Sequence, residues 1–113
     1  MKLLFLVLNK TEKLDEILSE FVKNNIKGAT IIDSMGMAQL LNAKYDEDEL
    51  SFLSSLRSFL NPEREKNNIV FTVIEDNMLD IAVKSIENVI GDLCTKDTGV
   101  VFSVPVDYVK GII

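Results

Sequence analysis

The stretch GATIIDSMGMA (residues 28–38) separates two similar parts of the chain. Its first half has the pattern of a strand over residues 30–34, and its second half leads into a segment without a core-like pattern. Residues 39–68 are rich in acidic residues and lack a continuous apolar pattern, and another apolar strand begins at Ile69. We therefore interpret residues 1–113 as a single domain in which residues 39–68 form an excursion between two strand–helix–strand units.

The unit before the excursion begins with a continuous apolar run, LLFLVL, at residues 3–8. Such a run is typical of a central strand that is covered on both faces. Thr11 is a good candidate for a helix N-cap. The apolar stripe that follows at helical spacing consists of Leu14, Ile17, Leu18, Phe21 and Val22. This pattern predicts an amphipathic helix that ends before Gly28.

The unit after the excursion repeats this order. Residues 69–74 form a second continuous apolar run, and either Asp76 or Asn77 is expected to cap a helix. The stripe of that helix consists of Leu79, Ala82, Val83, Ile86, Val89 and Ile90. A last strand is expected over residues 100–106, and Pro105 within it favours an edge position.

Two such units predict an α+β fold, the ferredoxin-like βαββαβ sandwich, with a four-stranded antiparallel sheet and both helices on one face. The first and third strands would be central, and the second and fourth would be edges. The face of the sheet without helices would still be apolar, through Leu4, Leu6, Phe71 and Val73 or their alternates. We therefore expect the protein to associate with a partner.

The excursion itself contains a short helical pattern. Its apolar face consists of Phe52, Leu53, Leu56, Phe59 and Leu60, and Pro62 prevents its continuation. Four consecutive acidic residues at positions 46–49 could suggest a divalent cation, but they lack the glycine and the distal glutamate of a calcium loop. We therefore expect no metal site there.

Composition excludes several classes of function. The chain is 47% hydrophobic and carries a net charge of −6, so it lacks the basic face that nucleic-acid backbones require. It has no histidine and one cysteine, Cys94, which excludes a zinc site, a disulfide within the chain and histidine-dependent nucleophilic triads. No catalytic pair is visible, so we expect no enzyme. No apolar run approaches membrane-spanning length, and the expected location is the cytoplasm.

Several short segments, in their order and spacing, resemble a known family. They are Lys2-Leu3-Leu4, residues 13–18, residues 26–31, Gly36-Met37-Ala38, residues 69–74 and the turn Thr98-Gly99 that enters residues 101–104. Over nearly its whole length the chain resembles the nitrogen-regulatory PII signalling proteins and their PII-like relatives. The resemblance implies a homotrimer of ferredoxin-like subunits. It also implies that a small effector, such as an adenine nucleotide, binds in clefts between subunits, and that the loop at 39–68 docks onto a target protein.

The resemblance also implies a set of ligand-binding residues. Thr30 and Gly36 would lie along the adenine and phosphate side of the cleft, and Gly99 would belong to the phosphate-holding turn. With the two arginines of the excursion and the nearby residues, the candidates are Thr30, Gly36, Met37, Ala38, Arg57, Arg64, Thr98, Gly99 and Lys110. Simpler interpretations remain open, because Thr30 fits a strand, the glycines fit turns and the arginines fit a solvated surface.

Other positions depart from the family pattern. Val100 stands where nucleotide-binding members have a basic residue, and Gln39 stands where an arginine would start the loop. Gly111 and Ile113 fall where two further arginines would lie, which leaves Lys110 nearby. We therefore expect a divergent PII-like protein with weak or no ATP binding. The alternative function is a ligand-free structural or adaptor trimer. Cys94 is expected to be a small buried residue.

Overall fold

The computed structural model describes residues 1–37 and 66–111. The elements of this part of the chain are β1 (Lys2–Leu8), η1 (Thr11–Lys13), α1 (Leu14–Lys23), β2 (Thr30–Ser34), β3 (Asn67–Ile74), η2 (Asp76–Met78), α4 (Leu79–Ile90) and β4 (Gly99–Pro105). The prediction of a mixed α+β fold with a four-stranded antiparallel sheet and two helices is confirmed for these residues. The third strand begins two residues earlier than the sequence suggested, because Asn67 and Asn68 pair with β2.

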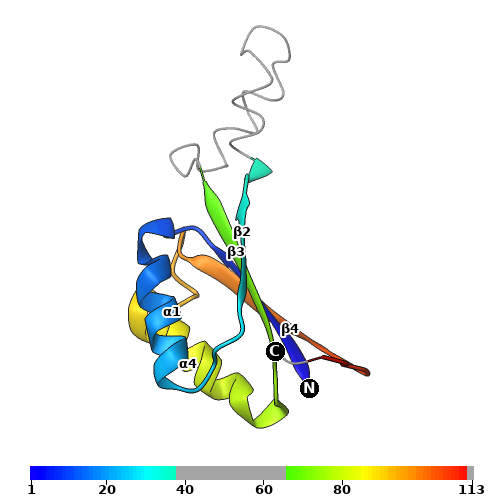
Figure 1. Cartoon of the computed structure of the whole chain (residues 1–113). Coiled ribbons are helices and arrows are strands. Elements are labelled where there is room, and N and C mark those ends of the chain that lie inside the picture. The colour runs from blue at the N-terminus through cyan, green and yellow to red at the C-terminus, as the bar shows by residue number, and fades with distance from the viewer. Residues whose placement is uncertain (38–65, 112–113) are drawn as a thin grey trace, which may run out of the picture.

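The sheet has the strand order β2-β3-β1-β4, and each neighbouring pair is antiparallel. β1 and β3 are therefore the inner strands, and β2 and β4 are the outer ones. The helices α1 and α4 pack against each other and lie on the same side of the sheet (Figure 1). This arrangement leaves the other side of the sheet without a helical cover.

The core lies between the helices and the sheet. Alternate residues of β1 and β3 point into it, as strand geometry requires, so Leu4, Leu6 and Leu8 are buried while their neighbours are only partly covered. The remaining core residues are Ile17, Phe21, Ile26, Val70, Ile74, Ala82, Ile86 and Ile90. Truncating one fully buried leucine to alanine typically costs about 2–5 kcal/mol. This single cluster supports both strand–helix–strand units.

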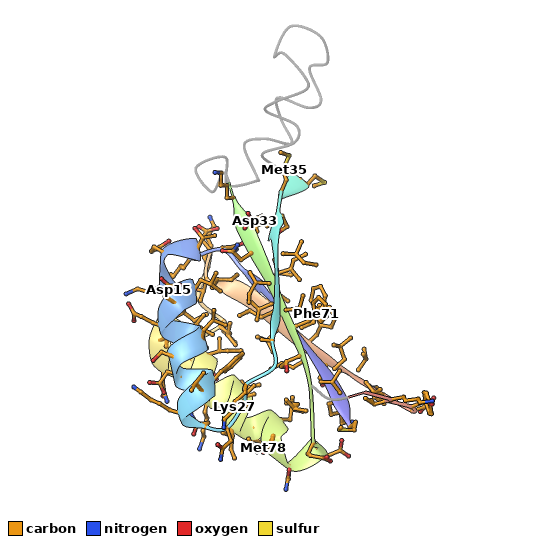
Figure 2. The ribbon with its side chains drawn as sticks, viewed as in Figure 1. Asp15, Lys27, Asp33, Met35, Phe71 and Met78 are labelled. Atoms are coloured by element: carbon orange, nitrogen blue, oxygen red, sulfur yellow. The ribbon has the colours of Figure 1, made fainter. Side chains whose placement is uncertain are left out.

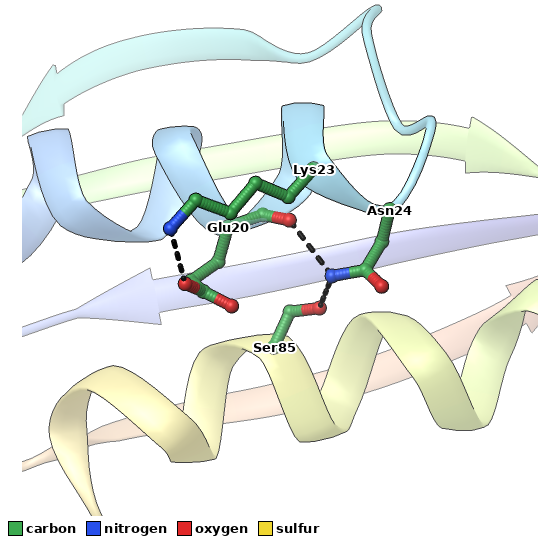
Figure 3. A network of polar contacts seen from close by, with 4 residues as sticks. All are labelled: Glu20, Lys23, Asn24 and Ser85. Carbon is green, nitrogen blue, oxygen red and sulfur yellow. Dashed lines mark hydrogen bonds and ion pairs between the residues drawn. The ribbon is translucent and has the colours of Figure 1, made fainter.

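A polar network joins the two helices where α1 ends (Figure 3). The side-chain amide of Asn24 donates to the carbonyl oxygen of Glu20 at 2.9 Å and to the Ser85 Oγ at 3.1 Å. Ser85 is 2% exposed, and its hydroxyl donates to the Ile81 carbonyl at 2.8 Å. The buried Ser85 hydroxyl thus has its hydrogen bonds satisfied, and the C-terminal end of α1 is held against α4.

The predicted side-chain caps are wrong. No side-chain cap hydrogen bond is made by Thr11 or by the residues that precede α4, because both helices begin with a 3₁₀ turn. In these turns the Lys13 amide donates to the Lys10 carbonyl and the Met78 amide donates to the Glu75 carbonyl, both at 2.9 Å. In each 3₁₀ turn a backbone carbonyl accepts a hydrogen bond from an amide near the helix start, where a capping side chain was expected to accept it.

Candidate functional site

One end of the sheet collects the segments that the sequence singled out. Ser34 pairs with Asn67 across β2 and β3, and Leu8 at the end of β1 pairs with both Asn68 and Gly99. The described part of the chain stops at Met37, shortly after β2, and resumes at Lys66, directly before β3, so residues 38–65 are attached at this end of the sheet. We call it the loop end of the sheet.

A pocket of about 480 Å³ lies at the loop end, and we call it the β2–β3 pocket. Its described lining residues come from η1, β2 and β3 and the positions next to them: Thr11, Asp33, Ser34, Met35, Lys66, Asn67 and Asn68. Figure 2 shows Asp33 near the end of β2 and Met35 just beyond it, at the loop end of the sheet. The volume falls within the roughly 300–1,000 Å³ that is usual for small-molecule sites.

One charged group of this pocket, the Asp33 carboxylate, is held in place by a residue of β3. The Asn68 side-chain amide donates to Asp33 Oδ1 at 2.9 Å, and Asn68 is 7% exposed whereas Asp33 is exposed. Lys66 is exposed, and it makes no ion pair or hydrogen bond with any residue among 1–37 and 66–111. The Ser34 hydroxyl is buried without a hydrogen-bond partner in the same part of the chain. A carboxylate and an ammonium group therefore share one pocket without neutralising each other directly.

Gly36 and Met37 lie beside this pocket. A Cβ atom added to Gly36 would lie 3.1 Å from Asn67 Nδ2, which is a tight approach to a side chain that could shift. Met37 is 57% exposed. The candidates Ala38, Arg57 and Arg64 lie outside the described residues.

Thr98 and Gly99 have a structural explanation within one chain. Thr98 is completely buried, its carbonyl oxygen accepts from the Asn9 amide at 3.3 Å, and its hydroxyl has no partner in the described regions. A Cβ atom added to Gly99 would lie 2.7 Å from the Val7 carbonyl oxygen, at a φ of +157°. Glycine is therefore required here for the close approach of β4 to β1.

Thr30 and Lys110 lie away from the loop end. Thr30 pairs with Phe71 along β2, and it is exposed. Lys110 follows β4, whose last residue Pro105 pairs with Lys2 at the opposite end of the sheet. The described candidates at the loop end are therefore Gly36, Met37, Thr98 and Gly99, whereas Thr30 and Lys110 lie elsewhere.

An ion pair lies at the opposite end of the sheet. Of the described candidate ligand residues, only Lys110 follows the strand that ends there. The Met1 ammonium group lies 2.9 Å from Asp76 Oδ1, and this hydrogen bond with its accompanying charge lowers the pKa of Asp76. Nothing in this pair suggests a ligand site.

Cys94 is exposed, so the expectation of a buried residue is wrong. It lies in the turn between α4 and β4, outside the core, where its amide donates to Asp92 Oδ1 at 2.9 Å.

The sheet face opposite the helices is apolar, and we call it the open sheet face. By register and alternation it comprises Leu3, Phe5, Val7, Thr30, Ile32, Ile69, Phe71, Val73, Val100, Phe102 and Val104. The Phe5 ring stacks on Phe71 with ring centroids 6.3 Å apart and on Phe102 with centroids 4.8 Å apart. Figure 2 shows Phe71 on the side of the sheet away from the helices.

The outer strands leave much of this face uncovered. Val100 is 58% exposed and Phe102 is 46% exposed on β4, and Ile32 is 46% exposed on β2. The sequence left open whether Leu4 and Leu6 or their alternates contribute to this face, and in the structure Leu4 and Leu6 are buried towards the helices. Their alternates Leu3, Phe5 and Val7 take that place.

Asp33, Lys66 and Asn68 are not among the residues that the sequence predicts to bind a ligand. A signal was present, because Asp33 directly follows the two isoleucines of its strand and two asparagines precede the apolar run of β3. What the sequence could not supply was the pairing of Asp33 with Asn68, which places these groups in one pocket.

Comparison with protein-family models found no matching family, and comparison with curated proteins found no match. Within the described ranges, no helix is long and apolar enough to cross a membrane. The same residues contain no group of three or more histidine, cysteine, aspartate or glutamate side chains that could hold a metal ion.

Proposed function

We propose that this protein is a divergent PII-like regulatory protein that forms a homotrimer of ferredoxin-like βαββαβ subunits. In this proposal a small effector binds in the clefts between subunits, and the excursion at 39–68 acts on a partner protein in the cytoplasm. The strand order and the placement of both helices on one side of the sheet support the ferredoxin-like assignment.

The observation that carries the proposal is the open sheet face. It presents stacked aromatic rings and branched apolar side chains, and its outer residues are about half exposed in a single chain. Contiguous apolar patches larger than a few hundred Å² are rare on monomeric proteins. A closed trimer with the sheets facing inward would bury three such faces together and would give each chain the cover that its helices do not provide.

The effector cleft of this proposal is bordered by Gly36 and Gly99, which lie at the same end of the sheet. Lys110 lies beyond the opposite end, so it would approach a cleft from a neighbouring subunit. Val100 offers an apolar side chain where ATP-binding relatives are expected to have a cation. Each charge-assisted contact to a phosphate contributes roughly 1.5–3 kcal/mol. A mononucleotide or a small carboxylate is therefore a better ligand than ATP.

A second candidate function is a ligand-free structural or adaptor trimer. It is favoured by the finding that Thr98 is completely buried and that Gly99 is explained by its approach to the Val7 carbonyl. Both residues then serve the strand pairing, and neither requires an effector.

Thermal unfolding in the presence of ATP, AMP and a set of small carboxylates separates the two candidates. A ligand at one hundred times its dissociation constant adds about 2.7 kcal/mol to the free energy of unfolding. We expect no shift with ATP and an increased melting temperature with AMP or a carboxylate. A panel without any shift would favour the adaptor trimer. Micromolar ATP affinity by calorimetry would show that the assignment of the phosphate contacts is wrong.

A further inference from the structure

We infer that the β2–β3 pocket is a binding site of its own for a small zwitterion, a molecule with one ammonium group and one carboxylate group. This inference goes beyond the proposed function. The proposed effector cleft lies between subunits, whereas the described charged groups of this pocket, Asp33 and Lys66, lie within one chain. No residue of a second chain is needed to bring these two groups together, because β2 and β3 are paired within one chain.

Asp33 supplies the acceptor for the ammonium group. Its Oδ1 accepts the Asn68 amide at 2.9 Å, and Asn68 is itself fixed in β3 and 7% exposed. The hydrogen bond holds the carboxylate in one orientation. Oδ2 has no partner among residues 1–37 and 66–111, and the side chain is exposed. An orientated carboxylate with a free oxygen is a suitable acceptor for an ammonium group.

Lys66 supplies the opposite charge. It stands directly before β3, so it borders the pocket from the strand next to the one that carries Asp33. The two charged groups are more than the 4 Å of an ion pair apart, since no such pair joins them. Neither charge is therefore satisfied by the other within the described part of the protein.

The separation of the two charges favours a zwitterion over a simple anion or a simple amine. A simple anion would be attracted by Lys66 but repelled by Asp33. A simple protonated amine would be attracted by Asp33 but repelled by Lys66. A molecule with both charges satisfies both groups, and its own net charge of zero matches that of the pair. The polar side chains of Thr11 and Asn67 add neutral hydrogen-bonding groups to the same lining.

The test uses the full-length protein and free α-amino acids as probes in isothermal titration calorimetry. Each amino acid is compared with the analogue that lacks its amine and the analogue that lacks its carboxylate; for alanine these are propionate and ethylamine. We expect at least one amino acid to bind, and both of its analogues to bind about tenfold more weakly or worse, because each loses a charge-assisted contact.

Two variants and two matched controls assign this preference to the pocket. Asp33→Asn keeps an oxygen for Asn68 but removes the charge, so the amino acid should bind no better than its carboxylate analogue. Lys66→Gln should bind the amino acid no better than its amine analogue. The controls Asp15→Asn and Lys27→Gln make the same changes at exposed positions outside the pocket and should bind as the wild type does (Figure 2).

The inference is overturned if no amino acid binds the wild type, if an analogue binds as tightly as its amino acid, or if both pocket variants behave like the wild type. The oligomeric state is measured on the same samples. A monomer that binds amino acids with this preference would refute the trimer and support the pocket. A trimer that binds none of them would refute the pocket alone.

Discussion

Substitution of Val100 by aspartate should dissociate the proposed trimer without unfolding the subunit. Val100 lies on the open sheet face at the outer strand β4, and 58% of it is exposed in a single chain. Val22 on α1 has the same exposed fraction, 58%, but lies on the helical side of the molecule. The sequence pattern predicts Val22 on the apolar stripe of its helix, but the structure leaves it on the solvent side. Its exposure makes Val22→Asp a matched control, since residue type, exposure and introduced charge are the same.

The expected loss of association free energy follows from the burial of Val100 in an interface. Complete burial of a valine side chain contributes about 1.5–3 kcal/mol, so covering the exposed half contributes about 1–2 kcal/mol. An aspartate would lose this contribution and would in addition bring an unpaired carboxylate into an apolar contact, at a cost of several kcal/mol. The sum is at least about 3 kcal/mol per subunit, which corresponds to roughly a hundredfold weaker association for each of them.

Light scattering after size-exclusion chromatography measures the effect, and circular dichroism checks that both variants are folded. We expect Val100→Asp to elute as a folded monomer at micromolar concentration, whereas Val22→Asp keeps the mass of the wild type. If Val100→Asp kept the wild-type mass, the open sheet face would not be the interface. Dissociation by both variants would show that the helical side takes part as well.

Two further predictions concern the loop end. Gly99→Ala should lower the free energy of unfolding in urea by about 1–3 kcal/mol, because its Cβ would lie 2.7 Å from the Val7 carbonyl oxygen; an unchanged stability would show that β4 can move away from β1 at no cost. Replacement of residues 40–65 by a short Gly-Ser linker should leave a folded trimer that no longer binds effector or partner, since Ser34 and Asn67 are already paired and loop closure depends only logarithmically on length. A monomeric or unfolded product in light scattering would instead make this segment part of the scaffold.

The strands could be predicted from the sequence because their apolar runs are continuous. Residues 3–8 and 69–74 carry enough apolar side chain to cover both faces, and both lie within the observed strands β1 and β3. The same continuity leaves open which residues face the helices and which lie on the open sheet face. In LLFLVL every residue is apolar, so periodicity alone cannot decide whether Leu4 or Phe5 meets the helices. That choice follows from the pairing with β3 and from the position of α1 and α4.

The candidate site was less predictable, because it depends on contacts between distant residues. The hydrogen bond from Asn68 to Asp33 spans 35 positions in the sequence. Gly99 was selected as a ligand residue by resemblance, yet the structure gives it a packing reason that no local pattern reveals. The helix starts also deviated, since a 3₁₀ turn and a capping side chain satisfy the same backbone groups and the sequence does not distinguish them.

The mass of the wild-type protein in solution tests the central proposal most directly. Light scattering at micromolar concentration should give three times the 12.7 kDa of one chain, because three open sheet faces would be buried together. A mass of 12.7 kDa at that concentration would contradict the account, since the apolar face would then be stable in water without a partner.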